Sequence, residues 1–178
     1  DKAEFLRAYG ADVFFDDLDL PRPDVNLAVG SAMHGAQTGA MLAGIEAVLL
    51  DERPDWVLVY GDTNSTLAGA LAAVKLHVPV AHVESGLRSF NRRMPEEVNR
   101  ILTDHCSTWL FAPTETAVAN LRNEGVKSDS VYLVGDVMFD AALHFGKVSD
   151  AQSRVMADNG LTHKGFVNHG CRQPVVDR

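Results

Sequence analysis

The sequence predicts an α/β domain built around a doubly wound parallel sheet. Four short apolar runs alternate along the chain with longer segments whose apolar residues recur at helical spacing. The runs are unbroken rather than alternating in polarity, which is typical of strands buried on both faces, as in a parallel sheet. With 178 residues, the chain can also bury a core without a disulfide or a metal site.

The four apolar runs are the expected strands, at residues 56–60, 78–83, 108–112 and 131–134. Gly61 and Gly135 close the first and the last run, where the chain is expected to turn. Pro79 lies at the beginning of the second run, a position where a strand tolerates proline.

Six segments show helical patterns, at residues 37–50, 63–77, 96–106, 114–124, 137–145 and 149–159. The second helix opens with good capping residues at positions 63–66. The third is amphipathic. Its apolar side carries Val98, Ile101, Leu102 and His105, and its polar side carries Glu96, Asn99, Arg100 and Thr103.

The composition excludes several classes of protein. The net charge of −8 repels nucleic acid and anionic membranes, although a local arginine cluster can still hold a small anion. Cys106 and Cys171 are too few for a disulfide framework, which favours a reducing compartment such as the cytoplasm. The best apolar stretch, residues 67–74, is too short to span a membrane and ends at Lys75. The chain opens with charge and no signal peptide, so we expect its N-terminus to be a cut.

Functional side chains are expected just after the strands, because ligands of open parallel sheets bind beyond the carboxyl ends of the strands. The first run is followed by Gly61, Asp62 and Thr63. Glycine allows the backbone to approach a ligand closely, and the N-terminus of the next helix attracts anions. Asp62 is explained equally well as the N-cap of that helix. Glu84 follows the second run with Arg88 nearby, either as functional groups or as a structural ion pair.

Arginines gather in the next segment of the chain. Arg88, Arg92, Arg93 and Arg100 lie within thirteen positions of an otherwise acidic sequence, which indicates an anion site such as one for phosphates. Glu96 opens the helix beside them. For Glu96 and Arg100, an exposed i,i+4 helix pair is the ordinary alternative explanation.

The histidines and the common ligand motifs add less. His82 follows apolar residues and is interpreted as a core or supporting residue rather than a catalytic one. His34 and His77 have no partners in the sequence that would indicate a metal site, and the chain has no dinucleotide, P-loop, metalloprotease or serine hydrolase motif.

Several motifs resemble those of one family, in the same order. Residues 57–63 read Val-Leu-Val-Tyr-Gly-Asp-Thr, and residues 82–88 read His-Val-Glu-Ser-Gly-Leu-Arg. Residues 94–100 read Met-Pro-Glu-Glu-Val-Asn-Arg, residues 112–115 Ala-Pro-Thr-Glu, and residues 135–140 Gly-Asp-Val-Met-Phe-Asp. Across roughly residues 12–167, the chain resembles the non-hydrolysing UDP-N-acetylglucosamine 2-epimerase family.

The resemblance implies a fold, a reaction and a set of residues. The fold is the two-domain, Rossmann-like architecture shared with B-type glycosyltransferases, of which this chain would be the N-terminal half. The reaction is inversion at C2 of a UDP-2-acetamido sugar for surface polysaccharide synthesis, by a homodimer that needs no metal and no nicotinamide. The implied catalytic residues are Asp62, Glu84, Glu96 and Arg100, and the implied substrate-binding residues are Gly61, Thr63 and Arg88.

The chain corresponds to less than half of a family member. Residues 1–146 would be a truncated N-terminal domain, and residues 147–178 a linker helix and the aborted start of the second domain. Residues 168–178 match nothing in the family pattern, and we expect this tail to be exposed or poorly ordered. A cleft enzyme that lacks one wall is expected to be inactive by itself.

Three alternatives stay open. A UDP-diacetamido-uronic acid is a second candidate substrate, because Arg92 and Arg93 would suit a sugar with its own carboxylate. A B-type glycosyltransferase-like protein would share the fold and the nucleotide sugar, although the Pro-Glu-Glu helix with Arg100 speaks against it. The third alternative is a remnant without catalysis, with at most a binding role.

Overall fold

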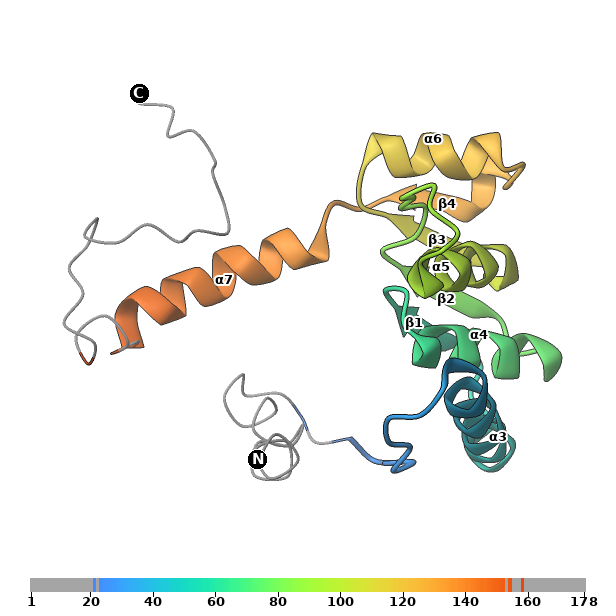
Figure 1. Ribbon diagram of the computed structural model, residues 1–178. Coiled ribbons are helices and arrows are strands. Elements are labelled where there is room, and N and C mark those ends of the chain that lie inside the picture. Colours follow the sequence, from blue (N-terminus) through green and yellow to red (C-terminus); the bar gives the residue numbers. More distant parts are fainter. Residues whose placement is uncertain (1–20, 22, 153, 155–157, 159–178) are drawn as a thin grey trace.

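The computed structural model describes residue 21, residues 23–152 and residues 154 and 158, in which helices and strands alternate (Figure 1). In chain order the elements are α3 (His34–Glu52), β1 (Val57–Tyr60), α4 (Asn64–Lys75), β2 (Val80–Val83), α5 (Pro95–Cys106), β3 (Trp109–Ala112), α6 (Glu115–Asn123), the 3₁₀ turn η1 (Ser128–Ser130), β4 (Val131–Leu133) and α7 (Val137–Gln152). All four expected strands are present, each one or two residues shorter than expected.

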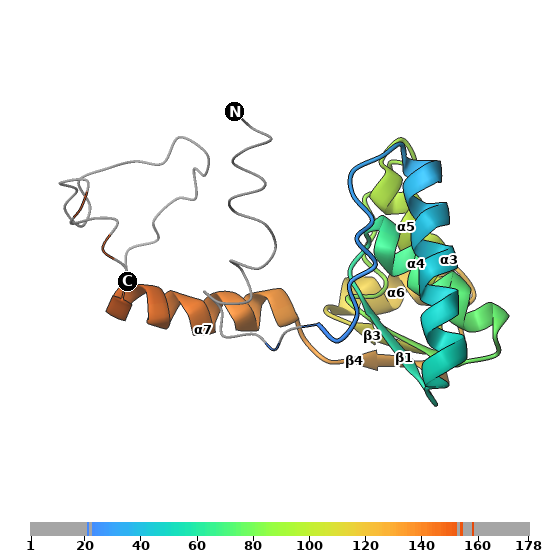
Figure 2. The same cartoon turned by 90° about the horizontal axis from the view of Figure 1, so that it is seen from below.

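The four strands form one parallel sheet in the order β1-β2-β3-β4, which confirms the α/β class. Val59, His82 and Leu110 lie in register across the first three strands. Each strand is joined to its neighbour through one helix, and such crossovers are right-handed, so α4, α5 and α6 lie on the same face of the sheet (Figures 1 and 2).

Two apolar clusters fill the space between the sheet and these helices. The first joins Leu49 of α3, Val59 of β1 and Val80 of β2 with alanines of α4. The second joins Leu110 of β3 with Leu121 of α6. The side of α4 that faces the sheet is almost free of large side chains, so this helix can lie close to the strands. Its buried alanines are Ala68, Ala70, Ala72 and Ala73.

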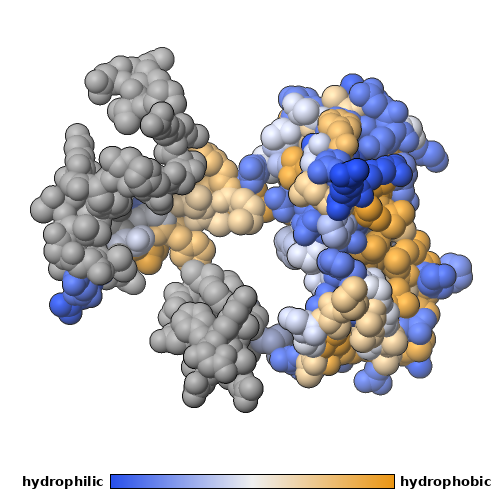
Figure 3. Space-filling model, in the orientation of Figure 1, coloured by the Kyte–Doolittle hydropathy of each residue, from blue (hydrophilic) through white to orange (hydrophobic). Residues whose placement is uncertain are grey.

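The amphipathic helix α5 buries its polar side, whereas such a helix ordinarily buries its apolar side. Its buried residues are Glu97, Asn99, Thr103 and Asp104. Val98 and Leu102 are 41% and 45% exposed, and apolar surface is visible over α5 in Figure 3. The inversion is tolerated because most of the buried polar groups have hydrogen-bond partners inside the molecule.

Helix α7 is one helix where two were expected. It runs from Val137 through Gly146 to Gln152, across the gap expected between segments 137–145 and 149–159. A single interior glycine costs only about 1 kcal/mol relative to alanine, too little to end a helix that meets no proline or turn sequence there. The helix extends away from the sheet (Figures 1 and 2).

Helix α7 also crosses the expected domain boundary at residue 146, and the division at that point stays a prediction. The expectation for the tail at residues 168–178 lies outside the described residues. In the described part of the chain, no helix is both long and apolar enough to cross a membrane.

The opposite face of the sheet is open. Leu58 and Tyr60 of β1 and Tyr132 of β4 are 49%, 61% and 44% exposed. Trp56 stacks on Trp109 at the same face, with ring centroids 3.9 Å apart. The unbroken apolar runs predicted burial on both faces, and over the described residues α4, α5 and α6 cover one.

Candidate active site

Asp62 and Glu84 lie at the same edge of the sheet, as expected for residues that follow neighbouring strands. The Gly61 amide donates to the Val83 carbonyl across 3.1 Å, which joins the turn after β1 to the end of β2. The Glu84 side chain lies over this turn, since a Cβ atom added to Gly61 would be 3.5 Å from Glu84 Oε2. Gly61 has a φ of 66°, which glycine adopts without strain.

Glu84 has an unusual backbone conformation. Its φ of 74° lies in the left-handed region, which residues other than glycine rarely adopt. The amides of Glu84 and Ser85 both donate to the Phe111 carbonyl of β3 at 3.1 Å. The neighbouring strand therefore holds Glu84 in a conformation that is costly by itself, as is common for residues at functional sites.

The surroundings of Glu84 favour its protonated form. Burial raises the pKa of this carboxyl above its ordinary value, and the nearby charges of Asp62 and Asp136 raise it further. The positive charges of His82 and Arg100 lower the same pKa, but by less. Glu84 therefore keeps its proton to a higher pH than an ordinary glutamate.

Arg100 of α5 reaches the turn after β1. Its guanidinium forms an ion pair with the Asp62 carboxylate and a longer contact of 3.6 Å with Glu97. The exposed pair with Glu96 that the spacing allowed is not the contact that forms, because Arg100 lies on the buried side of α5 and is 14% exposed. Among the described residues, its buried Nε has no hydrogen-bond partner.

Thr63, rather than Asp62, is the N-cap of α4. The Thr63 hydroxyl accepts from the Thr66 amide, and the Thr66 hydroxyl accepts from the Thr63 amide. Asn99 of α5 donates to the Asp62 carbonyl at 3.0 Å and to the Asn64 side chain at 3.1 Å. The capping explanation of Asp62 is therefore wrong, and the Thr63 hydroxyl, expected to contact substrate, is engaged in the cap.

Glu96 opens α5 and is exposed. It lines a cleft of about 300 Å³ together with Thr63, Asn64 and Ser65 at the start of α4. His34 of α3 lines the same cleft and lies 3.1 Å from the Asn64 amide nitrogen. Glu96 therefore lies beside the turn that carries Asp62, and its catalytic role stays a prediction.

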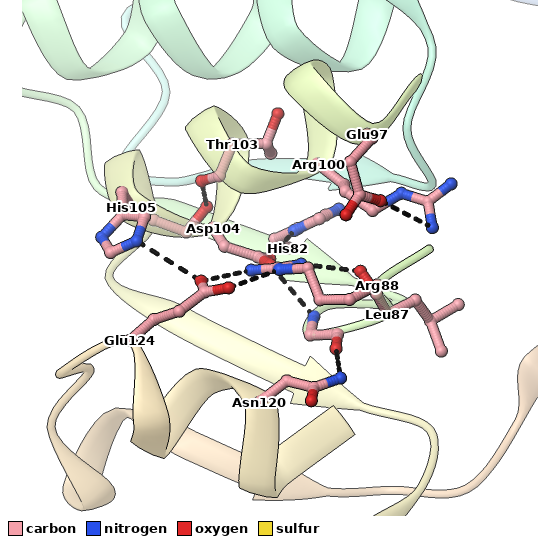
Figure 4. A network of polar contacts seen from close by, with 12 residues as sticks. His82, Leu87, Arg88, Glu97, Arg100, Thr103, Asp104, His105, Asn120 and Glu124 are labelled. Carbon is pink, nitrogen blue, oxygen red and sulfur yellow. Dashed lines mark hydrogen bonds and ion pairs between the residues drawn. The ribbon is translucent and has the colours of Figure 1, made fainter. Parts of the chain in front are cut away.

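Arg88 is buried, and its guanidinium is committed to the protein (Figure 4). It donates to the two Glu124 carboxylate oxygens at 2.8 and 2.7 Å, to Asp104 at 2.8 Å and to the Leu87 carbonyl at 2.7 Å. The sequence suggested Glu84 as its structural partner, but the partners come from α5 and the end of α6. The hydrogen bonds from Arg88 lower the pKa of Glu124.

The expected arginine cluster is divided between two environments. Arg88 and Arg100 each pair with carboxylates of the protein. Arg92 and Arg93 are exposed on the loop before α5. Of the four arginines, these two present their charge to solvent.

His82 is fully buried and joins two parts of the site. Its Nδ1 lies 2.7 Å from the Asp104 carboxylate, and its Nε2 lies 2.7 Å from the Gly61 carbonyl. Asp104 also accepts a hydrogen bond from the Gly86 amide at 3.0 Å. The interpretation of His82 as a supporting residue agrees with these contacts, whereas Asp104 was missed, because only the fold brings it to a residue 22 positions away.

Glu97 was also missed, although it directly follows Glu96. It is 1% exposed and accepts hydrogen bonds from the Ser89 amide and hydroxyl, both at 2.9 Å, and from the Phe90 amide at 2.8 Å. Burial by itself raises the pKa of Glu97, but these hydrogen bonds and Arg100 together lower it below its ordinary value. Glu97 is thus an ionised anchor for the loop after β2.

These contacts define a candidate acid–base site at the carboxyl edge of a parallel sheet. Two carboxylates follow neighbouring strands, an arginine of the next helix pairs with one of them, and a third carboxylate opens that helix. Such a set can hold and move protons on an adjacent ligand. Within the described residues, no group of three His, Cys, Asp or Glu side chains is arranged to hold a metal ion.

Comparison with known proteins identifies the family. The family model described as UDP-N-acetylglucosamine 2-epimerase matches residues 5–169, so the chain belongs to the UDP-N-acetylglucosamine 2-epimerase family.

Its relatives include enzymes named for two different sugars. The chain is 54% identical over 156 residues to a UDP-N-acetylglucosamine 2-epimerase homolog of Methanococcus maripaludis, an alignment that covers 87% of the chain and 43% of the relative. It is 55% identical over 153 residues to the UDP-2,3-diacetamido-2,3-dideoxy-D-glucuronate 2-epimerase of Pseudomonas aeruginosa, covering 85% of the chain and 43% of the relative.

A solved structure shows the same fold. The chain matches the crystal structure of Methanocaldococcus jannaschii UDP-GlcNAc 2-epimerase in complex with UDP-GlcNAc and UDP, with a TM-score of 0.81 and 53% identity. The match covers 84% of this chain and 41% of that one. The chain therefore spans about two fifths of the length of the relatives it matches.

Proposed function

We propose that this chain carries the proton-transferring part of a UDP-sugar 2-epimerase, which inverts C2 of a UDP-2-acetamido sugar. The observation that supports this most is the meeting of Asp62, Glu84 and Arg100 at one edge of the sheet. The relatives at 53–55% identity are named for this type of reaction, which gives the proposal its substrate class.

The chemistry explains why several carboxylates are needed. The proton at C2 of such a sugar is not acidic, because no carbonyl is attached to that carbon. Departure of UDP from C1 gives the ring oxocarbenium character and acidifies the neighbouring C–H bond. Elimination leaves a glycal and UDP in the cleft, after which a proton is added to the opposite face of C2 and UDP is added back to C1. Two faces require two proton-handling groups.

The environments of the carboxylates suit different roles in this reaction. Arg100 forms an ion pair with the Asp62 carboxylate, and a carboxylate is the form that removes a proton. Burial raises the pKa of Glu84, so this group holds a proton to deliver to the other face. Glu96, in the cleft beside them, is the third group proposed for proton transfer or for assisting the departure of UDP.

Two substrates remain in the proposal, UDP-N-acetylglucosamine and a UDP-diacetamido-uronic acid. Arg92 and Arg93 are exposed on the loop before α5, and their charge would suit a sugar that carries a carboxylate. A glycosyltransferase role loses support, because the chain belongs to the epimerase family.

The test replaces the corresponding segment of the Methanocaldococcus jannaschii enzyme with residues 23–152 of this chain. We expect the graft to epimerise one of the two UDP-sugars. D62N and E84Q in the graft should each lower kcat by roughly 10²–10⁴-fold, the usual contribution of a positioned acid or base. E46Q, on the exposed side of α3, is the matched control and should leave kcat unchanged. A folded graft that converts neither sugar, or full activity in D62N and E84Q, would contradict the proposal.

The 178-residue chain by itself is expected to show no turnover with either sugar. It spans about two fifths of its relatives, and a cleft without its second wall loses positioning and water exclusion. Losing about 7 kcal/mol of positioning lowers a rate by roughly 10⁵-fold. Epimer detected from the purified chain by nuclear magnetic resonance of the sugar would show that this expectation is wrong.

The homodimer and the cytoplasmic location belong to the same proposal. The exposed apolar side of α5, with Val98 and Leu102, supports an association of two copies. Sedimentation of the active graft at several concentrations tests the dimer.

A further inference from the structure

We propose that His82 is a positioning residue, held as a doubly protonated imidazolium that clamps the Gly61–Asp62 turn through the Gly61 carbonyl. The proposal deepens the proposed function, because it concerns the turn that carries the Asp62 carboxylate. It follows from the hydrogen bonds of one buried ring, and it can be tested without measuring epimerase activity.

Both ring nitrogens of His82 face acceptors. A backbone carbonyl cannot donate, so Nε2, which lies 2.7 Å from the Gly61 carbonyl, must carry a proton. Nδ1 lies 2.7 Å from Asp104 Oδ1. The other oxygen of Asp104 accepts from the Gly86 amide at 3.0 Å and from Arg88 at 2.8 Å. A carboxylate paired with a guanidinium only accepts hydrogen bonds, so we assign Nδ1 as a second donor.

The charges around the ring agree with a positive histidine. The side chains of His82 and Asp104 are 0% exposed and that of Arg88 is 1% exposed, so their charges need partners inside the protein. With His82 protonated, two cations, His82 and Arg88, face two anions, Asp104 and Glu124. A neutral ring would leave the fully buried Asp104 with Arg88 as its cation, and Arg88 is shared with Glu124, which is 28% exposed.

The charged groups around the ring come from several elements. Helix α5 contributes Asp104, the loop after β2 contributes Arg88, and Glu84 directly follows β2. The residues in register with His82 on β1 and β3 are Val59 and Leu110, which do not titrate. His105 lies 3.5 Å from Glu124, at the outer side of the cluster, and is 46% exposed.

The contacts connect α5 to the turn that carries Asp62, at the carboxyl edge of the sheet. Asp104 holds the ring, and the ring holds the carbonyl of the residue before Asp62. Asn99, one helical turn before Thr103 and Asp104, holds the Asp62 carbonyl itself. Two successive carbonyls of the turn are therefore fixed from one helix, which leaves the Asp62 carboxylate little freedom to move away from Arg100.

Nuclear magnetic resonance of the ring nitrogens tests the charge state. The 178-residue chain is labelled with ¹³C and ¹⁵N, and the His82 ring is assigned through its own backbone, so that no variant is needed. Because both ring nitrogens face acceptors, we expect both to carry a proton in the spectrum recorded at about pH 8. The ring of the exposed His77 is the control, and its nitrogen signals should differ from those of His82. A His82 ring with one bare nitrogen at pH 8 would overturn the proposal.

A pair of variants tests the clamp. Glutamine at position 82 keeps a donor for the Gly61 carbonyl, whereas leucine of similar size has none. We expect H82L to shift the amide signals of residues 61–63 more than H82Q does. In the active graft, H82L should lower kcat at least tenfold with a smaller change in KM, and H82Q should recover part of the loss. Equal behaviour of folded H82L and H82Q would contradict the clamp, and if neither variant folds, the ring spectrum of the unsubstituted chain decides.

The outcomes separate the two proposals. A protonated His82 in a chain whose graft epimerises neither sugar would leave the clamp standing and remove the proposed function. An active graft with a neutral His82 would support the proposed function and remove the clamp.

Discussion

At the scale of single residues, two glutamates of the same site have opposite electrostatic environments. Burial together with the neighbouring carboxylates raises the pKa of Glu84. Glu97 is buried more deeply, but it accepts three hydrogen bonds from the loop after β2, and its pKa is lowered. Glu84 is thus suited to holding a proton, whereas Glu97 is suited to remaining ionised and fixing the loop.

The lowered pKa of Glu97 predicts how stability depends on pH. A carboxyl whose pKa is lower in the folded state stabilises the fold above its unfolded value of about 4.5, and this stabilisation is lost as the pH falls through the folded value. We expect E97Q to lose about 1–3 kcal/mol of unfolding free energy at pH 7 and to show a flatter loss of stability below pH 4.5. Urea unfolding at several pH values measures both, with the exposed E46Q as control. Parallel pH profiles for E97Q and the unsubstituted chain would rule out this role.

Gly86 is required by its surroundings as well as by its conformation. Its φ is 79°, and a Cβ atom there would lie 2.5 Å from the Ala117 carbonyl oxygen. We expect G86A to lose about 2–4 kcal/mol, from left-handed strain and from a clash with the backbone of α6. Gly39, in the interior of α3 with nothing within 4 Å, is the control, and G39A should be neutral or slightly stabilising. Thermal unfolding of the two variants gives the comparison, and a G86A variant as stable as G39A would be incompatible with the packing described here.

At the scale of elements, α5 shows how a polar helix face can be the buried one. Its inward side supplies Arg100 and Asn99 to the turn after β1, Glu97 to the loop after β2 and Asp104 to His82. The helix therefore organises the site, and its apolar residues are left on the surface. Amphipathicity alone predicts that the apolar side of this helix is the buried one.

Because α5 buries its polar side, we expect two leucines to differ in how much their replacement destabilises the fold. Leu102 of α5 is 45% exposed, so L102A should cost less than about 1 kcal/mol in a dilute sample. Leu121 of α6 is fully buried, so L121A should cost about 2–5 kcal/mol. Chemical unfolding at low protein concentration measures both. A larger loss for L102A than for L121A would mean that α5 packs with its apolar side inwards after all.

At the scale of the whole molecule, the two faces of the sheet differ. One is covered by α4, α5 and α6, and the other exposes apolar side chains of β1, β3 and β4. The only two tryptophans of the sequence, Trp56 and Trp109, stack on this open face and are 40% and 39% exposed. Intrinsic fluorescence therefore reports on this face alone.

We expect acrylamide to quench the tryptophan fluorescence of the 178-residue chain efficiently, because both rings are accessible. In the graft, quenching should be weaker, since unbroken apolar strands are typical of a sheet that is covered on both faces. W56F should change the emission of Trp109, because the rings stack with centroids 3.9 Å apart. Weak quenching already in the isolated chain would show that this face is covered there.

Local pattern determined much of the fold. The apolar runs and the helical spacing depend on residues within a few positions of one another, and all four strands and five of the helices appear close to where these patterns put them. The rule that ligands bind at the carboxyl ends of parallel strands also predicted that Asp62 and Glu84 share one edge of the sheet. The same local patterns predicted a gap after residue 145, which α7 crosses without a break.

The class of the fold, the family motifs and the residues at the ends of the strands can be predicted from the sequence, because each depends on adjacent or periodic positions. The partners of the long side chains cannot, because they come from distant parts of the chain. Arg88 pairs with Glu124, 36 positions away, and Arg100 pairs with Asp62, 38 positions away, although each has an acidic residue four positions before it. The physical reason is that the energy of a buried charge depends on which groups surround it in space, and that arrangement exists only after the strands have paired and α5 has packed on them.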